Sequence, residues 1–167
     1  MSTLFVDTIN EKTSGNGVAI PGHVIQFKTV GDGGVLNMNT STYTDLPGYS
    51  IAFTPKASNS LLWLFWTYHF FNQQDTSGTW RGADSRLLAG STAIYTGGSY
   101  GIAFNLTDAN DRYMDYVSHQ YVHTLTSASA VTYKIQVSKV KGDDNNAVFN
   151  NASYGSGGRF TIMEIAQ

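Results

Sequence analysis

Hydrophobic and polar residues alternate with a period of two along most of this chain, which is the pattern of half-buried β-strands. Three stretches show it most clearly: YSIAFTP, YGIAFNL and VTYKIQV. In the last of these, residues 131–137, every second side chain is apolar. The 3.6-residue period of an amphipathic helix is missing. The pattern therefore predicts an all-β chain.

Turn-forming segments rich in Gly, Asn and Asp separate the expected strands, because these residues tolerate the positive φ of tight turns. They lie at 31–34, 75–78, 96–99, 108–112, 141–146 and 155–158. Further strands are expected at 23–30, 86–95, 112–126 and 159–166. Pro55 should end the strand that contains Tyr49, Ile51 and Phe53, since proline has no amide hydrogen to give. Roughly seven or eight strands at this spacing favour an antiparallel β-sandwich or jelly roll.

The first 22 residues form a separate unit in this pattern. The sequence STLFVDTINEKTSGNGVAIPG contains two short strands around a Gly/Asn turn. Two such strands cannot bury a core alone, so we expect an arm at 1–22 that binds neighbouring molecules and a head domain at 23–167. The candidate attachment residues are the apolar positions of the arm: Leu4, Phe5, Val6, Ile9, Val18 and Ile20.

The segment SLLWLFWTYHFFN, residues 60–72, carries apolar side chains on both faces of a strand. A strand with one face in water should show polar residues there, and this one does not. We expect one face to pack in the core and the other in an oligomer interface, although alternation does not say which. The alternative is a strand covered on both sides within one chain. The interface candidates are Trp63, Phe65, Trp66, Tyr68 and Phe70.

Composition and charge narrow the classes of function. Only 13% of the 167 residues are charged, about half of the ~25% typical of globular domains. The net charge of −2 and the scattered lysines and arginines argue against nucleic-acid binding. No apolar run approaches the ~20 residues of a membrane helix, and the N-terminus MSTLFVDTIN lacks the features of a signal peptide. We therefore expect synthesis in a cytoplasm and no membrane insertion.

Motifs for catalysis are missing from the chain: it contains no GxSxG elbow, no HExxH and no phosphate-binding loop. Cysteine is absent, which excludes disulfides and thiolate metal sites. The string GDDNN at 142–146 fits a hairpin turn better than a calcium loop. His119 and His123 would lie about 13 Å apart along a strand, too far for one zinc ion, and His69 fits a core or interface position. We expect no enzyme activity, no cofactor and no metal.

Aromatic residues are the most informative class. Ten tyrosines, nine phenylalanines and three tryptophans exceed the needs of one small core. Several lie beside glycine-rich turns, where aromatic rings suit stacking on sugars or contact with proteins; the alternative is isolated surface aromatics. The candidate ligand-binding loop residues are Trp80, Arg81, Tyr95, Tyr100, Asn145, Asn146 and Tyr154.

Several phrases together resemble a known family. STLFVDTINEKTSGNGVAIPG resembles the N-terminal attachment motif of many tailed-bacteriophage fibre and virion structural proteins, in which LxVDxI is followed by SGNGV. PGHVIQF and YTDLPGYSIAFTPKASNS are similar to the start of the β-sandwich that follows, and FTIMEIA is similar to its last strand. The segment 72–128 carries no matching phrase.

The resemblance implies a non-enzymatic virion protein with a homotrimeric jelly-roll head of the tumour-necrosis-factor-like type. It implies aromatic strands around the three-fold axis and an arm bound to other virion proteins. No shaft separates arm from head, which favours a short fibre or fibre tip that contributes to attachment, with a host-surface glycan as candidate ligand. The alternatives are a capsid decoration or cement protein, a free carbohydrate-binding module and a polysaccharide depolymerase.

Overall fold

A computed structural model describes residues 20–31, 33–73, 80–97, 102–105, 112–139, 147–150 and 158–167, together with Thr8, Asn10 and Ser153. At 73, 80–81, 102–105 and 112–113 only the backbone is described. All regular secondary structure in these ranges is β-strand. The strands are β1 (Val24–Gly31), β2 (Leu36–Met38), β3 (Thr44–Phe53), β4 (Leu61–Gln73), β5 (Trp80–Ala89), β6 (Thr92–Thr96), β7 (Ile102–Asn105), β8 (Arg112–Thr124), β9 (Val131–Lys139), β10 (Ala147–Phe149) and β11 (Arg159–Ile165).

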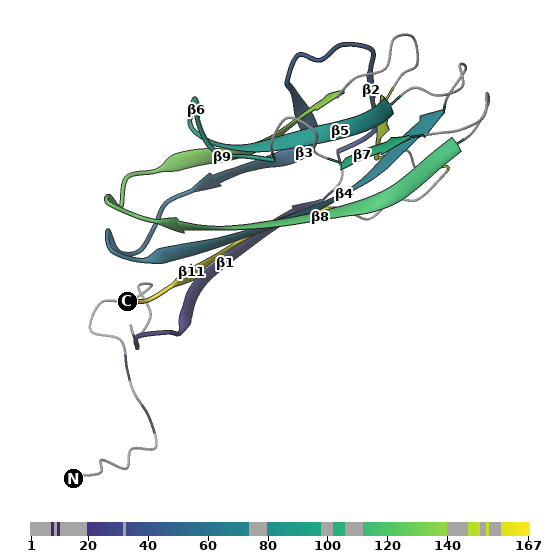
Figure 1. The fold of residues 1–167 in the computed structure, drawn as a ribbon. Coiled ribbons are helices and arrows are strands. Elements are labelled where there is room, and N and C mark those ends of the chain that lie inside the picture. Colours follow the sequence, from purple (N-terminus) through teal and green to yellow (C-terminus); the bar gives the residue numbers. More distant parts are fainter. Residues whose placement is uncertain are drawn as a thin grey trace.

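The strands form two antiparallel sheets that pack face to face (Figure 1). In the six-stranded sheet the order is β1-β11-β4-β8. The short β10 pairs with β4 at Phe70 and Phe71, past the end of β11, and β2 pairs with β10. In the five-stranded sheet the order is β3-β9-β5-β6, and β7 also pairs with β5. The orders 1-11-4-8 and 3-9-5-6 are two interlocked Greek keys, because the chain changes sheet after β2, β3, β4, β7, β8 and β9. The protein is therefore all-β with jelly-roll topology, which confirms the predicted fold class.

The core lies between the sheets and is built around the longest apolar strand. Every second residue of β4 from Leu62 to Phe70 is fully buried. These side chains face the buried residues Tyr133, Ile135 and Val137 of β9. Wide aromatic and branched side chains on alternating positions fill the space between two sheets, which explains why period-two patterns specify this fold.

One buried carboxylate fixes the loop between β3 and β4. Glu164 is fully buried on β11, and its Oε1 accepts hydrogen bonds from the backbone amides of Lys56 at 2.8 Å and Ala57 at 3.2 Å. Gln26 Nε2 donates to Glu164 Oε2 at 3.3 Å. The charge is thus compensated by amide donors, as a buried carboxylate requires.

Most predicted strands agree with the structure to within a few residues, and β3 ends at Phe53, just before Pro55. The single strand predicted at 86–95 is wrong. The segment is a hairpin, in which β5 ends at Ala89, β6 begins at Thr92 and Gly90 takes a φ of 62° that favours glycine. The strands β2 and β10 were not predicted, because three residues are too few to show alternation.

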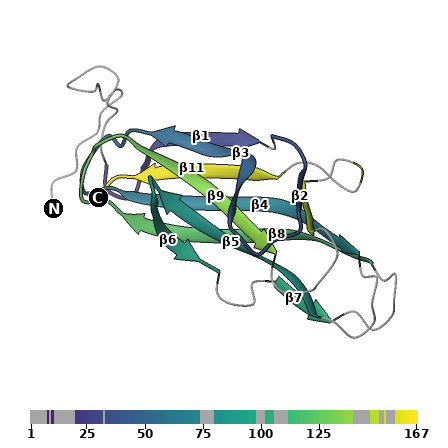
Figure 2. The same ribbon diagram turned by 90° about the horizontal axis from the view of Figure 1, so that it is seen from above.

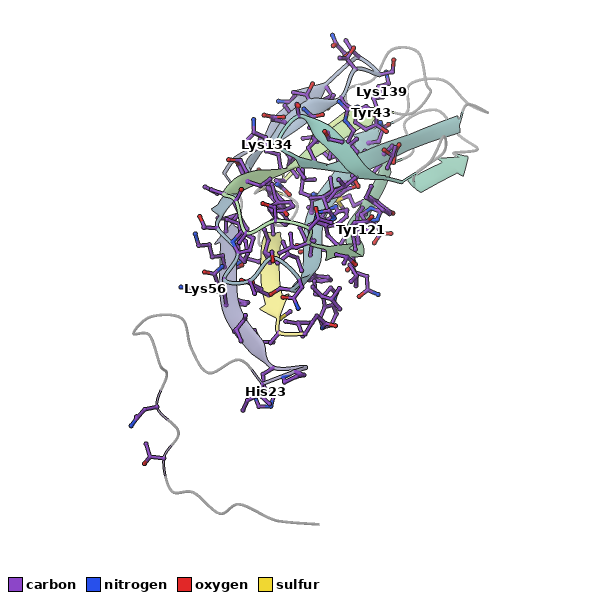
Figure 3. The ribbon with its side chains drawn as sticks, turned by 90° about the vertical axis from the view of Figure 1, so that its left-hand side faces the viewer. His23, Tyr43, Lys56, Tyr121, Lys134 and Lys139 are labelled. Carbon is purple, nitrogen blue, oxygen red and sulfur yellow. The ribbon has the colours of Figure 1, made fainter. Side chains whose placement is uncertain are left out.

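The N-terminal entry to the head is tied to the C-terminus. Pro21 and Gly22 form a tight turn in which His23 N donates to Ile20 O at 3.0 Å, and Gly22 has a φ of 86°. Gly22 N donates to Ala166 O at 2.8 Å, and Ala166 N donates to His23 O at 2.9 Å. Seen from above, β1 and β11 lie side by side (Figure 2). His23 thus marks one end of the sandwich, while Tyr43 and Lys139 lie towards the opposite end (Figure 3).

Of the predicted attachment residues only Ile20 is described, and its side chain is exposed. Leu4, Phe5, Val6, Ile9 and Val18 lie outside the described residues. The arm at 1–22 and its boundary with the head therefore stay predictions. Among the described residues there is no helix with the length and apolar character needed to cross a membrane.

Candidate assembly surface

The outer side of the six-stranded sheet is apolar where its strands are longest. In register across four strands lie Phe27 of β1, Met163 of β11, Trp63 of β4 and Val122 of β8. Phe27 is 57% exposed, Val122 is 56% exposed and Trp63 is 39% exposed. Side chains of paired residues stand side by side on one face of a sheet, so these four form a continuous apolar row.

Neighbouring rows extend the same surface. Val24, Ile165 and Leu61 form the next row towards the chain termini. Towards the other end, Tyr116 and Met114 of β8 are both more than half exposed. We call the set the apolar face, and its residues are Val24, Phe27, Leu61, Trp63, Phe65, Met114, Tyr116, Val122, Met163 and Ile165.

Several polar groups on this side of the sheet are hydrogen-bonded within the chain. The hydroxyls of Thr29 and Thr161 lie 3.0 Å apart, and Arg159 N donates to Thr67 Oγ1 at 3.1 Å. Among the described outward side chains of these strands, Arg159 alone is charged. These intrachain hydrogen bonds can be kept when another protein covers the surface.

Exposed apolar side chains are concentrated on this face. Of the eight large apolar side chains that are exposed in the described part of the chain, six belong to it, and Ile20 and Val35 are the other two. Monomeric proteins rarely leave large contiguous apolar patches in water. This concentration makes the apolar face the candidate interaction surface of the described part of the chain.

The outer side of the five-stranded sheet is polar by contrast. Lys134 Nζ donates to Asp45 Oδ2 at 2.8 Å, and Gln136 Nε2 donates to Asp45 Oδ1 at 2.6 Å. These two hydrogen bonds lower the pKa of Asp45 below its ordinary value, and the one from Lys134 has the larger effect. The Arg86 guanidinium stacks over the Tyr43 ring, 4.2 Å from its centroid. The two outer surfaces of the sandwich therefore differ sharply, and only one has the character of a protein interface.

The structure divides the predicted interface residues between two faces. Trp63 and Phe65 lie on the apolar face, Trp63 exposed and Phe65 half-buried. The prediction was wrong for Trp66, Tyr68 and Phe70, whose side chains are fully buried between the two sheets of the same chain. Their alternation with Trp63 placed them on the opposite side of β4, where no second chain can reach them.

Sequence reasoning missed most of the apolar face. Phe27, Met114, Tyr116, Val122 and Met163 were not interface candidates, because they come from strands far apart in the chain and only the register joins them. One signal was available: the strands at 112–126 and 159–166 both carry apolar residues on each face. Only 60–72, the most extreme case, was interpreted in that way.

Histidines and aromatic rings line the inner side of β8 at the edge of the core. His119 stacks on Trp66, with ring centroids 5.2 Å apart, and its Nδ1 lies 3.3 Å from Tyr95 Oη. Tyr121 stacks on His123 at 6.5 Å, and His123 meets Tyr133 edge-on at 6.1 Å. Among the described residues no group of three or more His, Asp or Glu could hold a metal ion.

This cluster corrects one candidate for ligand binding. Tyr95 is not in a loop: it lies on β6 and packs half-buried against Trp66, with centroids 5.4 Å apart. Trp80 and Arg81 begin β5, and only their backbone is described. The other candidates, Tyr100, Asn145, Asn146 and Tyr154, lie outside the described residues, as does the string at 142–146.

Burial makes the fold sensitive to mild acid. It lowers the pKa of His69, His119 and His123, and the charges of Asp115 and Asp84 oppose the shift for His69 and His119 respectively. Below about pH 6.5, the ordinary histidine pKa, the unfolded chain therefore binds more protons than the folded one, and stability falls as pH falls. We expect a lower melting temperature at pH 5.5 than at pH 7.5. In His119→Phe, which keeps the aromatic stack, the decrease should be smaller; an unchanged decrease would exclude His119 as a source.

The two Greek keys define a jelly-roll domain, and the apolar face is its candidate assembly surface among the described residues. No protein-family model matches the chain, and no curated protein sequence matches it. Among solved structures, it is similar to infectious bursal disease virus, Gx strain, with 14% identity and a TM-score of 0.41 over 98% of this chain and 42% of that chain.

Two further solved structures are similar at comparable or lower levels. One is a mutant VP2 protein of infectious bursal disease virus in derived T=1 particles, with 13% identity and a TM-score of 0.40 over 84% of this chain and 36% of that chain. The other is dimeric latent PorU from Porphyromonas gingivalis, with 11% identity and a TM-score of 0.33 over 90% and 14%. The chain spans less than half the length of each of these proteins. At such values the function has to be argued from the residues of this chain.

Proposed function

We propose that this chain is a non-enzymatic virion structural protein, a short trimeric fibre or fibre tip that contributes to host-surface attachment. Its head self-associates through the apolar face, and its arm, residues 1–22, binds other proteins of the particle. The observation that carries the proposal is the contrast between the apolar outer side of the six-stranded sheet and the polar outer side of the five-stranded sheet. The sequence resemblance to phage fibre proteins is the basis for placing the protein on a virion and for expecting three copies.

The apolar face fits further copies of the same chain. Burial of apolar surface stabilises by about 25 cal/mol per Å², so covering side chains as exposed as Phe27, Trp63 and Val122 yields several kcal/mol for each copy. The face carries almost no charge that a partner would have to match. A second copy offers an equally uncharged apolar surface, and three copies around an axis cover all three faces at once.

The two ends of the sandwich suit display on a particle. The arm enters beside Ala166 at one end. The strand ends at Gln73, Asn105 and Lys139 lie at the opposite end, since β4, β5 and β8 run the length of the sheets. Of the candidate ligand-binding residues, Asn145 and Asn146 lie in the connection that follows Lys139, and Trp80 and Arg81 begin β5 directly after the connection that follows Gln73. Three copies of a weak glycan site on one rigid head would bind with avidity.

Locating the protein on purified particles tests this function. Antibody labelling should place it at the tail, with the arm required: a chain that lacks 1–22 should fold but fail to join the particle. Label over the capsid lattice would contradict the fibre and favour a capsid decoration protein. Failure to find the protein in particles, with glycan binding by the isolated chain that is lost in Trp80→Ala, would favour a free carbohydrate-binding module.

A further inference from the structure

The outer edge of β8 is the least protected strand edge of the described structure. β8 spans 13 residues and pairs with β4 over its whole length without a register shift. No described strand pairs with its other side. Its sequence, RYMDYVSHQYVHT, contains neither proline nor lysine. A long regular edge of this kind invites pairing with another chain.

The edges of the other sheet carry the usual protection. β3 contains Pro47 and a register shift between Asp45 and Ser50. β6 and β7 have only five and four residues. In the six-stranded sheet, the short β2 has three residues. The remaining edge is β1, which is shifted only between Val24 and Gln26 and is regular from Gln26 to Gly31. It carries one lysine, Lys28, whose Nζ donates to Ala52 O of β3 at 2.8 Å.

β1 and β8 are complementary edges of one sheet. β1 runs antiparallel to β11, β11 to β4 and β4 to β8, so β1 and β8 run in opposite directions. They also lie at the same level, because Thr29 pairs with Thr161, Thr161 with Phe65 and Phe65 with Gln120. Rotation about an axis parallel to the strands preserves both relations. It can therefore place β8 of one copy beside β1 of the next as an antiparallel pair.

The apolar row leads to the same arrangement independently. Its two ends, Phe27 on β1 and Val122 on β8, are its most exposed members, at 57% and 56%. If Val122 of one copy lay beside Phe27 of the next, the two side chains would cover each other. The apolar rows of adjacent copies would then be continuous. Head-to-tail contacts of this kind close into a ring when the rotation is right.

We propose that β8 of each copy pairs with β1 of the next, so that the four long strands of each sheet join into one closed antiparallel belt with the apolar faces turned towards the axis. The five-stranded sheets lie outside, with their polar surfaces in solvent. This arrangement rests on the proposed self-assembly and names the partner surface for it. It differs from packing of the sheet faces alone, because the backbone of β8 is hydrogen-bonded across the interface.

Disulfide trapping tests the pairing cleanly, since the chain contains no cysteine. Within one chain Thr29 and Gln120 are three strand spacings apart, roughly 14 Å, beyond the ~7 Å limit between Cα atoms in a disulfide. In the assembly the double variant Thr29→Cys/Gln120→Cys should give covalent dimers and trimers under diamide on a non-reducing gel. Neighbouring pairs with Ser118→Cys or Val122→Cys cover a shift of two residues in register.

The matched control uses the edges of the other sheet. Ser50 on β3 and Ala93 on β6 are also exposed. They lie at the same level of the sheet, because Ser50 pairs with Lys134, Lys134 with Leu88 and Leu88 with Ala93. The double variant Ser50→Cys/Ala93→Cys should stay uncrosslinked. Covalent dimers of Gln120→Cys alone would show β8 meeting β8 and would overturn the proposal. A trimer by native mass that none of the β1–β8 pairs crosslinks would overturn the pairing and leave the proposed function standing. A monomer by native mass would contradict both the pairing and the proposed self-association.

Discussion

Replacing Trp63 with aspartate is expected to dissociate the assembly into folded monomers. Trp63 lies at the centre of the apolar row, between Met163 and Val122, and its side chain is partly exposed in the single chain. A carboxylate there would lose its water in the interface without a partner. Central interface residues of this kind typically contribute about 2–4 kcal/mol, which is roughly thirty- to a thousandfold in affinity for each contact.

Two measurements separate assembly from folding in this variant. Native mass should change from three chains to one, while the far-ultraviolet circular dichroism of the β-sandwich is retained. Ser50→Asp, on the exposed polar side of β3, introduces the same charge and should leave the trimer intact. A Trp63→Asp protein that remains trimeric would show that the apolar face is not the interface.

Replacing Trp66 with alanine is expected to have the largest effect on stability. Trp66 is fully buried; its ring packs against Tyr95 and His119, and its Nε1 lies 3.4 Å from Ser85 Oγ. Truncating a buried tryptophan typically costs about 3–5 kcal/mol, a large part of the 5–15 kcal/mol that stabilises most domains.

The comparison of Trp66→Ala with Trp63→Ala makes this test specific. The two residues lie three positions apart on one strand but on opposite sides of the sheet. Urea unfolding of the monomeric forms, prepared in a Val122→Asp background, should show a large loss of stability for Trp66→Ala and a small one for Trp63→Ala. Equal losses would contradict the assignment of the two faces.

Much of the fold was accessible from the sequence because a sandwich needs period-two patterns and turn residues. The alternation in 131–137, the break before Pro55 and the apolar last strand all have a local cause, and the structure agrees with them. The order of the strands within each sheet has no such cause. The strand order depends on which strand faces meet across the core. The sequence of a single strand does not specify its neighbours in the sheet.

The candidate surface was predictable only in part for the same reason. The sequence indicated that β4 is apolar on both faces, but it could not say whether Trp63 or Trp66 points inward. The register shows that Trp63 shares its side with Phe27 and Val122, which are distant in the chain. The predicted interface therefore contained two residues of the outer face and three of the core.

The number of chains in the oligomer that this protein forms in solution tests most directly the claim that the head self-associates as a trimer. Native mass spectrometry at micromolar concentration should give three copies of the 18.2 kDa chain, and dilution or Trp63→Asp should convert them to single chains without loss of the β-sandwich signal. A stable monomer at that concentration, with the apolar face left in water, would contradict the account.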